Sequence, residues 1–269
     1  MRLDWSTATD GSLSDSREDR VYELYHENSK LFLQTAQDQA EMRSANPFEL
    51  FVSSRGFRRF THRPGIDLPD PLPSNEALSD IMWRRRSGRE LSGPIEIEEL
   101  ATLLRQALGP TAIVQNKELG IAQSLRAWPS AGALYPLDTY VIANRVRGLP
   151  AGVYHFNPLP ARLELLPSRG VAEVLRDGFF WQEFVCAAAV TVLLVAAFDR
   201  TVAKYGERGY RLVLLDAGHA AQNLLLTAEQ LRLGAVGVGG FGDDALAADL
   251  GLDGISEAVV HAMCAGKVP

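Results

Sequence analysis

The 269-residue sequence predicts an α+β fold, and three observations lead to that class. Residues 210–231 follow a helical pattern with apolar side chains on almost every side, which is typical of a buried helix. Residues 137–166 contain three short strand patterns separated by turn residues. Strands and helices elsewhere alternate without the regular count of a βαβ protein. The length suits one large domain, or one domain with an extension.

Residues 1–74 are predicted to form an N-terminal extension, partly disordered and with one helix. The first 20 residues are polar, and a helical pattern then covers Val21 to Ala40. Residues 44–74 carry Pro, Gly and Ser without clear periodicity. The extension has too little apolar content to fold alone, so the main domain is expected over residues 75–269.

The elements of the main domain are expected in the following order. Ser74 caps a helix that runs to an arginine-rich segment at residues 84–89, and a second helix covers Ile95 to Leu108. Residues 109–133 are expected to be a loop. The remaining pattern predicts strands at Leu137–Ala143, Val153–Phe156, Leu163–Leu166, 189–198, Ala235–Val238 and Ala258–Cys264, with short helices near 171–187 and another from Asp243.

The long helix has one narrow polar stripe. Asp216, His219, Gln222 and Asn223 recur at helical spacing and are expected to bond one another along the helix. Small residues at 217–221 would let another backbone approach closely. Gly234 is expected to supply the C-terminal cap.

Composition and charge exclude several functions. The net charge of −6 argues against a nucleic-acid partner. The longest apolar run, residues 184–198, is shorter than a membrane helix, so no membrane association is expected. The polar beginning of the chain does not match a signal peptide, and a cytoplasmic location is predicted. Neither H-E-x-x-H nor paired C-x-x-C spacing occurs, so no metal is expected.

A glycine motif near the C-terminus resembles a dinucleotide-binding fingerprint. Residues 237–242 satisfy G-x-G-x-x-G between a predicted strand and a predicted helix. A Rossmann half needs further βα units after this motif, and fewer than thirty residues remain. The glycines more plausibly allow a flat, bulky group to approach the backbone, since they carry no Cβ.

Three further segments could carry chemistry. The arginine-rich segment at residues 84–89 suits a phosphate, although cations also complement the end of a helix. Residues 128–136, WPSAGALYP, form a stiff loop with accessible amides, or an ordinary turn. Lys204 and Tyr205 could form an acid–base pair, but charged residues before a helix more often line a solvated edge.

Seven segments in a fixed order together resemble the SagB-type dehydrogenases of the nitroreductase superfamily. These flavin enzymes oxidise azolines to azoles in thiazole- and oxazole-containing peptides. The resemblance covers about residues 20–269 and rests on YHENSK at 25–30, RRRSGRELSG at 84–93, PSAGALYPLDTYV at 129–141, GLPAGVYHFNP at 148–158, KYGERGYR at 204–211, DAGHAAQNL at 216–224 and GGFGDDAL at 239–246.

The resemblance implies a central antiparallel sheet flanked by helices, bound FMN, and a homodimer with the flavins at its interface. It assigns the phosphate and ribityl chain to Arg85, Arg86, Ser87 and Arg89, with Lys267 also on the phosphate. It places Pro129, Ser130, Ala131, Gly132 and Ala133 along the flavin ring, with Gly239 and Gly240 against the isoalloxazine. Lys204 and Tyr205 match the pair implicated in azoline oxidation.

The leading hypothesis is therefore an FMN-dependent azoline dehydrogenase acting on a peptide, which a cyclodehydratase partner presents. Two alternatives remain open. One is an NAD(P)H-dependent nitro- or quinone reductase of the same fold. The other is a non-catalytic subunit that docks a cyclodehydratase. The peptide, the ring type and the electron acceptor are not encoded in any motif.

Overall fold

The computed structural model describes residues 21–30, 58–116 and 121–268. A seven-stranded sheet forms the centre of the described chain, and each strand pairs antiparallel with its neighbour. The strand order is β1 (Gly65–Asp67), β8 (Arg162–Leu165), β7 (Gly152–Asn157), β5 (Leu137–Ala143), β9 (Val190–Ala197), β11 (Glu257–Gly266) and β10 (Gly234–Val238). The predicted α+β class and its antiparallel sheet are confirmed.

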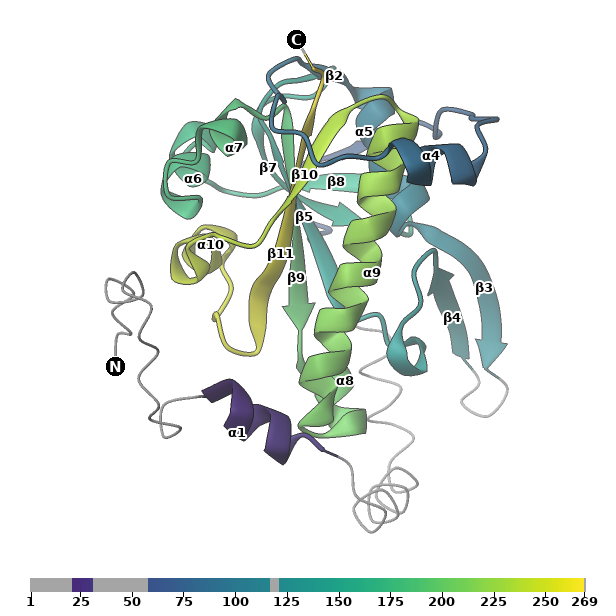
Figure 1. Ribbon diagram of the computed structural model, residues 1–269, viewed down its shortest axis with the longest axis vertical. Coiled ribbons are helices and arrows are strands. Elements are labelled where there is room, and N and C mark those ends of the chain that lie inside the picture. The colour runs from purple at the N-terminus through teal and green to yellow at the C-terminus, as the bar shows by residue number, and fades with distance from the viewer. Residues whose placement is uncertain (1–20, 31–57, 117–120, 269) are drawn as a thin grey trace.

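Helices cover both faces of this sheet, so the fold has three layers. The long helix α9 (Arg208–Gln230) lies along one face, and α5 (Ile97–Leu108) packs beside it (Figure 1). On the other face lie α6 (Val171–Gly178), α7 (Glu183–Ala187) and α10 (Asp243–Leu250).

Alternation along the strands divides the core into two. In β9, Val192 and Leu194 face α9, while Leu193 and Val195 face the other helices. All eight residues of β9 are buried, because both faces of this central strand are covered. This explains why the segment reads as a continuous apolar run.

The exposed face of α9 departs from the all-round burial that its sequence predicts. Val213, Ala217 and Ala221 pack into the core. Leu215 on the opposite side is 58% exposed, and Tyr210 and Leu214 are each 41% exposed. In the single chain, this helix therefore has an apolar face with no cover among the described residues.

Two predicted caps and one predicted loop are wrong. Helix α4 (Leu78–Arg84) begins after Ala77, three residues beyond Ser74. Helix α9 ends at Gln230 with Leu231 as its C-cap, and Arg232 takes the left-handed conformation expected of glycine, so Gly234 instead opens β10. The expected loop at 109–133 contains the hairpin of β3 (Pro110–Asn116) and β4 (Ile121–Arg126), and η3 (Ala131–Ala133).

That hairpin projects away from the main sheet at the side of the molecule (Figure 1). Its two strands pair only with each other among the described residues. Residues Thr111 to Gln115 are all exposed, so they lack the alternation of burial that reveals a half-buried strand. A second small sheet joins β2 (Ile95–Glu96) and β6 (Val146–Arg147) in parallel.

Parts of the predicted extension contact the main domain. Strand β1 joins the edge of the large sheet by pairing with β8. Helix α1 (Val21–Asn28) lies beside the start of α9, where Arg208 donates to the Ser29 carbonyl and Tyr25 meets Tyr210 edge to face. The helix expected from Val21 to Ala40 ends at Asn28, and Ser29 and Lys30 are not helical. Residues 31–40 lie outside the described residues. The boundary at residue 74 stays a prediction. Within the described ranges, no helix combines the length and apolarity needed to cross a bilayer.

Candidate functional site

The arginine-rich segment follows α4 and runs past the start of β10. Gly88 donates from its backbone N–H to the Ala235 carbonyl at 3.0 Å, and Gly93 pairs with Lys267 through two backbone bonds of 2.9 Å. Arg84 is used inside the fold, where it ion-pairs with Glu76 and Glu229. It therefore belongs to the scaffold.

The next three arginines are placed differently. Arg85 reaches the Ser87 hydroxyl at 3.4 Å, and Arg86 donates to backbone carbonyls. Arg89 lies over the Phe184 ring of α7, with 5.3 Å between guanidinium and ring centroid. None of the three has a carboxylate partner among the described residues. Three cations and a hydroxyl thus share a short exposed segment, which is a donor set suited to a phosphate.

Gly239 and Gly240 follow β10 and are both exposed. A Cβ built on Gly239 would have no atom of the chain within 4 Å, so open space lies before this backbone. Gln182, just before α7, donates to the Gly240 carbonyl at 2.6 Å. Because α7 contacts both Gly240 and Arg89, the glycines and the arginine segment belong to one region. We call Arg85, Arg86, Ser87, Arg89, Gly239, Gly240 and Lys267 the arginine–glycine group.

Lys267 is the member of this group that is ion-paired within the chain. Its Nζ lies 3.1 Å from the Glu99 carboxylate. Glu99 is also half of the capping box at the start of α5, where it accepts from the Glu96 backbone N–H at 2.7 Å. A phosphate at Lys267 would therefore share this ammonium with Glu99.

The loop at Pro129 to Ala133 lies against the first half of α9. Ser130 donates its hydroxyl to the Asp216 carboxylate and accepts the backbone N–H of Tyr135 at 2.9 Å. Asp216 is 3% exposed, and burial raises the pKa of its carboxyl, which the hydrogen bonds from Ser130 and the Ala131 backbone partly offset. Asp216 therefore bonds the loop and not the other members of the predicted polar stripe, contrary to the sequence prediction.

Lys204 and Tyr205 end the short helix α8 (Asp199–Tyr205) and meet this loop. A Cβ built on Gly132 would lie 2.7 Å from Lys204 Nζ and 2.7 Å from Tyr205 Oη. The backbone of Gly132 is thus in contact with both functional groups, and its φ of 60° is one that glycine adopts easily. Pro129–Ala133, Lys204 and Tyr205 form what we call the loop–lysine group.

Arg208 and Arg211, the two arginines that follow Lys204 in the sequence, both point to α1. Arg208 donates to the Ser29 carbonyl at 3.2 Å, and Arg211 to the His26 carbonyl at 2.6 Å. Both guanidinium groups hold α1, which explains why YHENSK and KYGERGYR occur together.

The two groups lie apart in the single chain. β5, which follows the loop, and β10, which precedes the glycines, are separated by three strand intervals, or about 14 Å at roughly 4.8 Å each. Along α9, the residues from Asp216 to Gln230 span about 21 Å at roughly 1.5 Å per residue. The exposed apolar residues of α9, Tyr210, Leu214 and Leu215, come just before Asp216 on the helix.

Comparisons with known proteins identify the family to which this chain belongs. The sequence model described as "Nitroreductase family" matches residues 82–267. The chain belongs to the nitroreductase family. It is 36% identical over 180 residues to the nitroreductase-family protein MJ1384 of Methanocaldococcus jannaschii, covering 66% of this chain and 85% of that one.

Two other relatives are named as microcin- and trifolitoxin-processing proteins. The microcin B17-processing protein McbC of Escherichia coli is 29% identical over 48% of this chain and 49% of its own. The trifolitoxin-processing protein TfxB of Rhizobium leguminosarum is 27% identical over 68% of this chain and 51% of its own. The chain thus spans about half of these two relatives.

Solved structures confirm the nitroreductase fold. A nitroreductase crystal structure from Anabaena variabilis superposes with a TM-score of 0.66 and 29% identity, covering 78% of this chain and 42% of that one. The Escherichia coli microcin synthetase McbBCD complex with truncated pro-MccB17 matches at a TM-score of 0.59 and 24% identity, covering 84% of this chain and 83% of the matched one.

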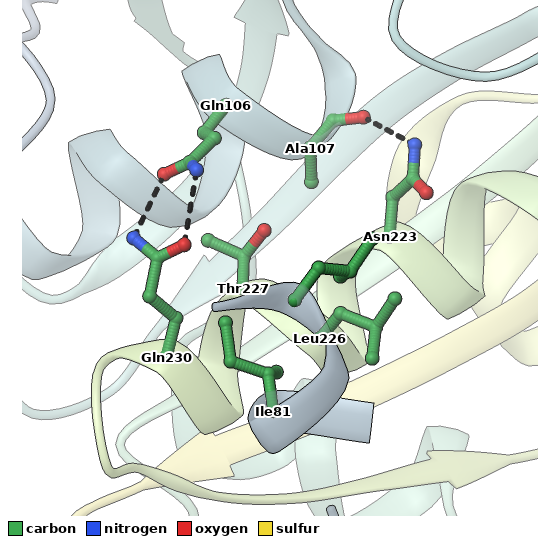
Figure 2. A pocket seen from close by; sticks show the side chains of 8 residues that line it. Ile81, Gln106, Ala107, Asn223, Leu226, Thr227 and Gln230 are labelled. Carbon is green, nitrogen blue, oxygen red and sulfur yellow. Dashed lines mark hydrogen bonds between the residues drawn. The ribbon is translucent and has the colours of Figure 1, made fainter. Parts of the chain in front are cut away.

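The nitroreductase domain also contains a pocket of about 200 Å³ between α4, α5 and α9 (Figure 2). Its rim is closed by the amides of Gln106 and Gln230, which exchange hydrogen bonds of 3.1 and 3.2 Å. None of the predicted site residues lines it. The lining residues are Leu78, Ile81, Gln106, Ala107, Asn223, Leu226, Thr227 and Gln230.

Sequence reasoning missed three contributors to the site. They are Asp216, Gln182 and Glu99. Asp216 stands in the DAGHAAQNL segment that helped to establish the resemblance, and its burial is the signal that could have separated it from the polar stripe. Gln182 and Glu99 stand outside every segment that was singled out for chemistry. No cluster of three or more potential metal ligands occurs in the described part of the chain.

Proposed function

We propose that this nitroreductase-family oxidoreductase is an FMN-dependent dehydrogenase that converts azolines to azoles in a peptide. The observation that carries the proposal is the contact of Gly132 with Lys204 Nζ and Tyr205 Oη. It gathers a basic group, a hydroxyl and an accessible backbone at one place. The peptide-processing relatives McbC and TfxB support the same substrate class.

The residues present fit FMN. Arg85, Arg86 and Arg89 lack carboxylate partners among the described residues, so a dianionic phosphate would balance their charge. Ser87 would add a hydroxyl donor. The open backbone at Gly239 and Gly240 would accept the isoalloxazine face, and Pro129–Ala133 would line its other side.

A symmetric homodimer would complete this site. One flavin cannot easily touch both groups of the same chain, given their separation. We infer that the arginine–glycine group of one subunit faces the loop–lysine group of the other, with the exposed face of α9 between the subunits. A cyclodehydratase partner would present the peptide, as the McbBCD complex with its pro-peptide suggests.

The chemistry divides between cofactor and protein. Bound flavin supplies the acceptor for the hydride that leaves the azoline ring. Lys204 takes the proton from the ring carbon next to the carbonyl. Tyr205 donates a hydrogen bond to that carbonyl and so stabilises the charge that develops on it. The substrate loses two electrons and two protons in all, and dioxygen is our proposed final acceptor.

The test uses the full-length protein with an azoline peptide. Lys204→Ala and Tyr205→Phe should retain flavin absorbance and lose azoline oxidation by about 10²–10⁴-fold, the usual contribution of general acid–base catalysis. Wild-type turnover in both variants would make the pair a solvated edge. Loss of flavin together with activity would make its role structural.

A reductase is the second candidate, because MJ1384 is described as a nitroreductase. In that case NADH or NADPH should bleach the bound flavin rapidly, and a nitroaromatic or quinone should restore its colour. A preparation that stays colourless after incubation with FMN would instead favour a non-catalytic docking subunit.

A further inference from the structure

Asp216 is a buried carboxylate in α9, and its partners all come from one loop. It is 3% exposed, and none of the ion pairs of the described residues includes it. A buried charge of this kind is costly unless hydrogen bonds satisfy it. The hydroxyl of Ser130 and the backbone N–H of Ala131 supply those bonds. Asp216 is therefore committed to the loop before β5.

The same loop holds an unfavourable backbone conformation. Gly132, Ala133 and Tyr135 have φ values of 60°, 54° and 47°, and two of the three are not glycine. Left-handed residues persist in such a run only when their surroundings over-determine them. Ser130 provides that restraint, because its hydroxyl donates to Asp216 and accepts the N–H of Tyr135 at 2.9 Å, at the far end of the run.

The restrained backbone ends against the proposed acid–base pair. A methyl group added at Gly132 would displace Lys204 Nζ and Tyr205 Oη, since both lie 2.7 Å from its position. A shift of the loop would therefore change the space in which the substrate ring meets both groups. Displacement of reacting groups by about 1 Å can lower a rate by roughly 10²-fold.

We propose that Asp216 is a positioning residue that acts through Ser130 to hold Gly132 against Lys204 and Tyr205. The proposal rests on the azoline dehydrogenase function and deepens it. The effect of Asp216 passes through the loop, from the Ser130 hydroxyl to the Gly132 backbone.

The rate experiment compares variants in the full-length, flavin-loaded protein. Asp216→Asn and Ser130→Ala should lower kcat for an azoline peptide by about 10²-fold, with KM and flavin absorbance close to wild type. Ser130→Thr keeps the hydroxyl and suits the extended backbone at this position (φ −133°, ψ 140°), so it should restore most of the rate.

Thr227→Val is the matched control. Thr227 is a buried polar residue of α9 that lies three helical turns beyond Asp216, on the same side of the helix. It lies about 16 Å along α9 from Asp216, at roughly 1.5 Å per residue, so its kcat should equal that of the wild type. Equal effects at Thr227 and Asp216 would show a general loss of packing and would overturn the proposal.

A labelling experiment reads the loop position without turnover. The acetylation rate of Lys204, mapped by mass spectrometry and referred to Lys267, should rise severalfold in Ser130→Ala and stay unchanged in Thr227→Val. If labelling rises in Ser130→Ala but the wild-type protein oxidises no azoline, the proposed function is wrong and the positioning role of Asp216 and Ser130 is retained. If the wild type is active, and both Asp216→Asn and Ser130→Ala keep the wild-type kcat and labelling rate, only the positioning role is wrong.

Discussion

At the scale of single residues, Gly132 combines a left-handed backbone conformation with a place beside the proposed acid–base pair. Gly132→Ala places a methyl group 2.7 Å from both Lys204 Nζ and Tyr205 Oη, at a positive φ. We expect it to destabilise the fold by about 1–3 kcal/mol and to lower azoline oxidation by roughly 10²-fold. Urea unfolding and steady-state kinetics measure the two effects.

Gly148→Ala separates backbone strain from the effect on the pair. Gly148 has a φ of 84°, and its added Cβ would meet only the Ile97 side chain, at 3.1 Å. It should lose comparable stability and keep its activity. If Gly132→Ala turns over substrate as fast as Gly148→Ala, the position of the Gly132 loop does not affect catalysis by Lys204 and Tyr205.

The sequence was enough to select these residues as candidates for the site, but not to predict that they contact one another. Lys204 and Tyr205 are 72 and 73 positions from Gly132, so no local pattern records the contact. The role of Asp216 could not be predicted, because its spacing to His219 and Gln222 also fits a polar stripe. Only the packing of the loop against α9 decides which side of the helix it faces.

At the scale of elements, a buried polar network joins β7, β8 and the segment before β1. His155 and Glu164 are cross-strand partners, with 2.9 Å between Nδ1 and Oε2. Glu164 also accepts from the Phe60 backbone N–H at 2.9 Å and from Asn157 at 3.1 Å. Arg58 and Asp138 act on the histidine through their charges.

This network should make stability fall on acidification. Burial lowers the pKa of His155, although Glu164 acts in the opposite direction, so the native state holds the neutral ring. The unfolded chain binds the proton more readily, and stability is lost as pH falls below about 6.5. Burial raises the pKa of Glu164, but its hydrogen bonds outweigh that and lower it, so its stabilisation is lost below about pH 4.5.

The expected slope is at most about 1.4 kcal/mol per pH unit for each such histidine. Burial also lowers the pKa of His261, so two histidines contribute in the wild type. Urea unfolding between pH 7 and pH 5 should give a smaller slope for His155→Gln and an unchanged slope for His62→Gln, at an exposed position. Identical slopes in all three proteins would contradict the assignment.

Elements that are buried could be predicted from the sequence, and exposed elements could not. β5 and β9 were placed correctly because each is buried on both faces. The β3–β4 hairpin was missed because its side chains at 111–115 are exposed, so no burial pattern marks it. The helix ends were misjudged where Ala77 and Arg232 occupy positions that usually favour Ser and Gly.

At the scale of the whole molecule, the exposed face of α9 should be an interface between two copies. Leu215→Glu places a charge in the centre of that face. We expect this variant to sediment as a monomer and to lose its flavin, since each site would draw on both subunits. Ile255→Glu, at an 83% exposed position before β11, should stay a flavin-loaded dimer. A dimeric, yellow Leu215→Glu protein would place the interface elsewhere.

The arginine segment has a second consequence, for the solubility of the protein. The segment that is proposed to hold phosphate also covers the beginning of the edge strand β10, because its Gly88 donates to the Ala235 carbonyl. An unshielded edge can recruit strands from other molecules and start aggregation. Protein depleted of FMN should therefore precipitate sooner on storage than FMN-loaded protein, and added FMN should slow the precipitation.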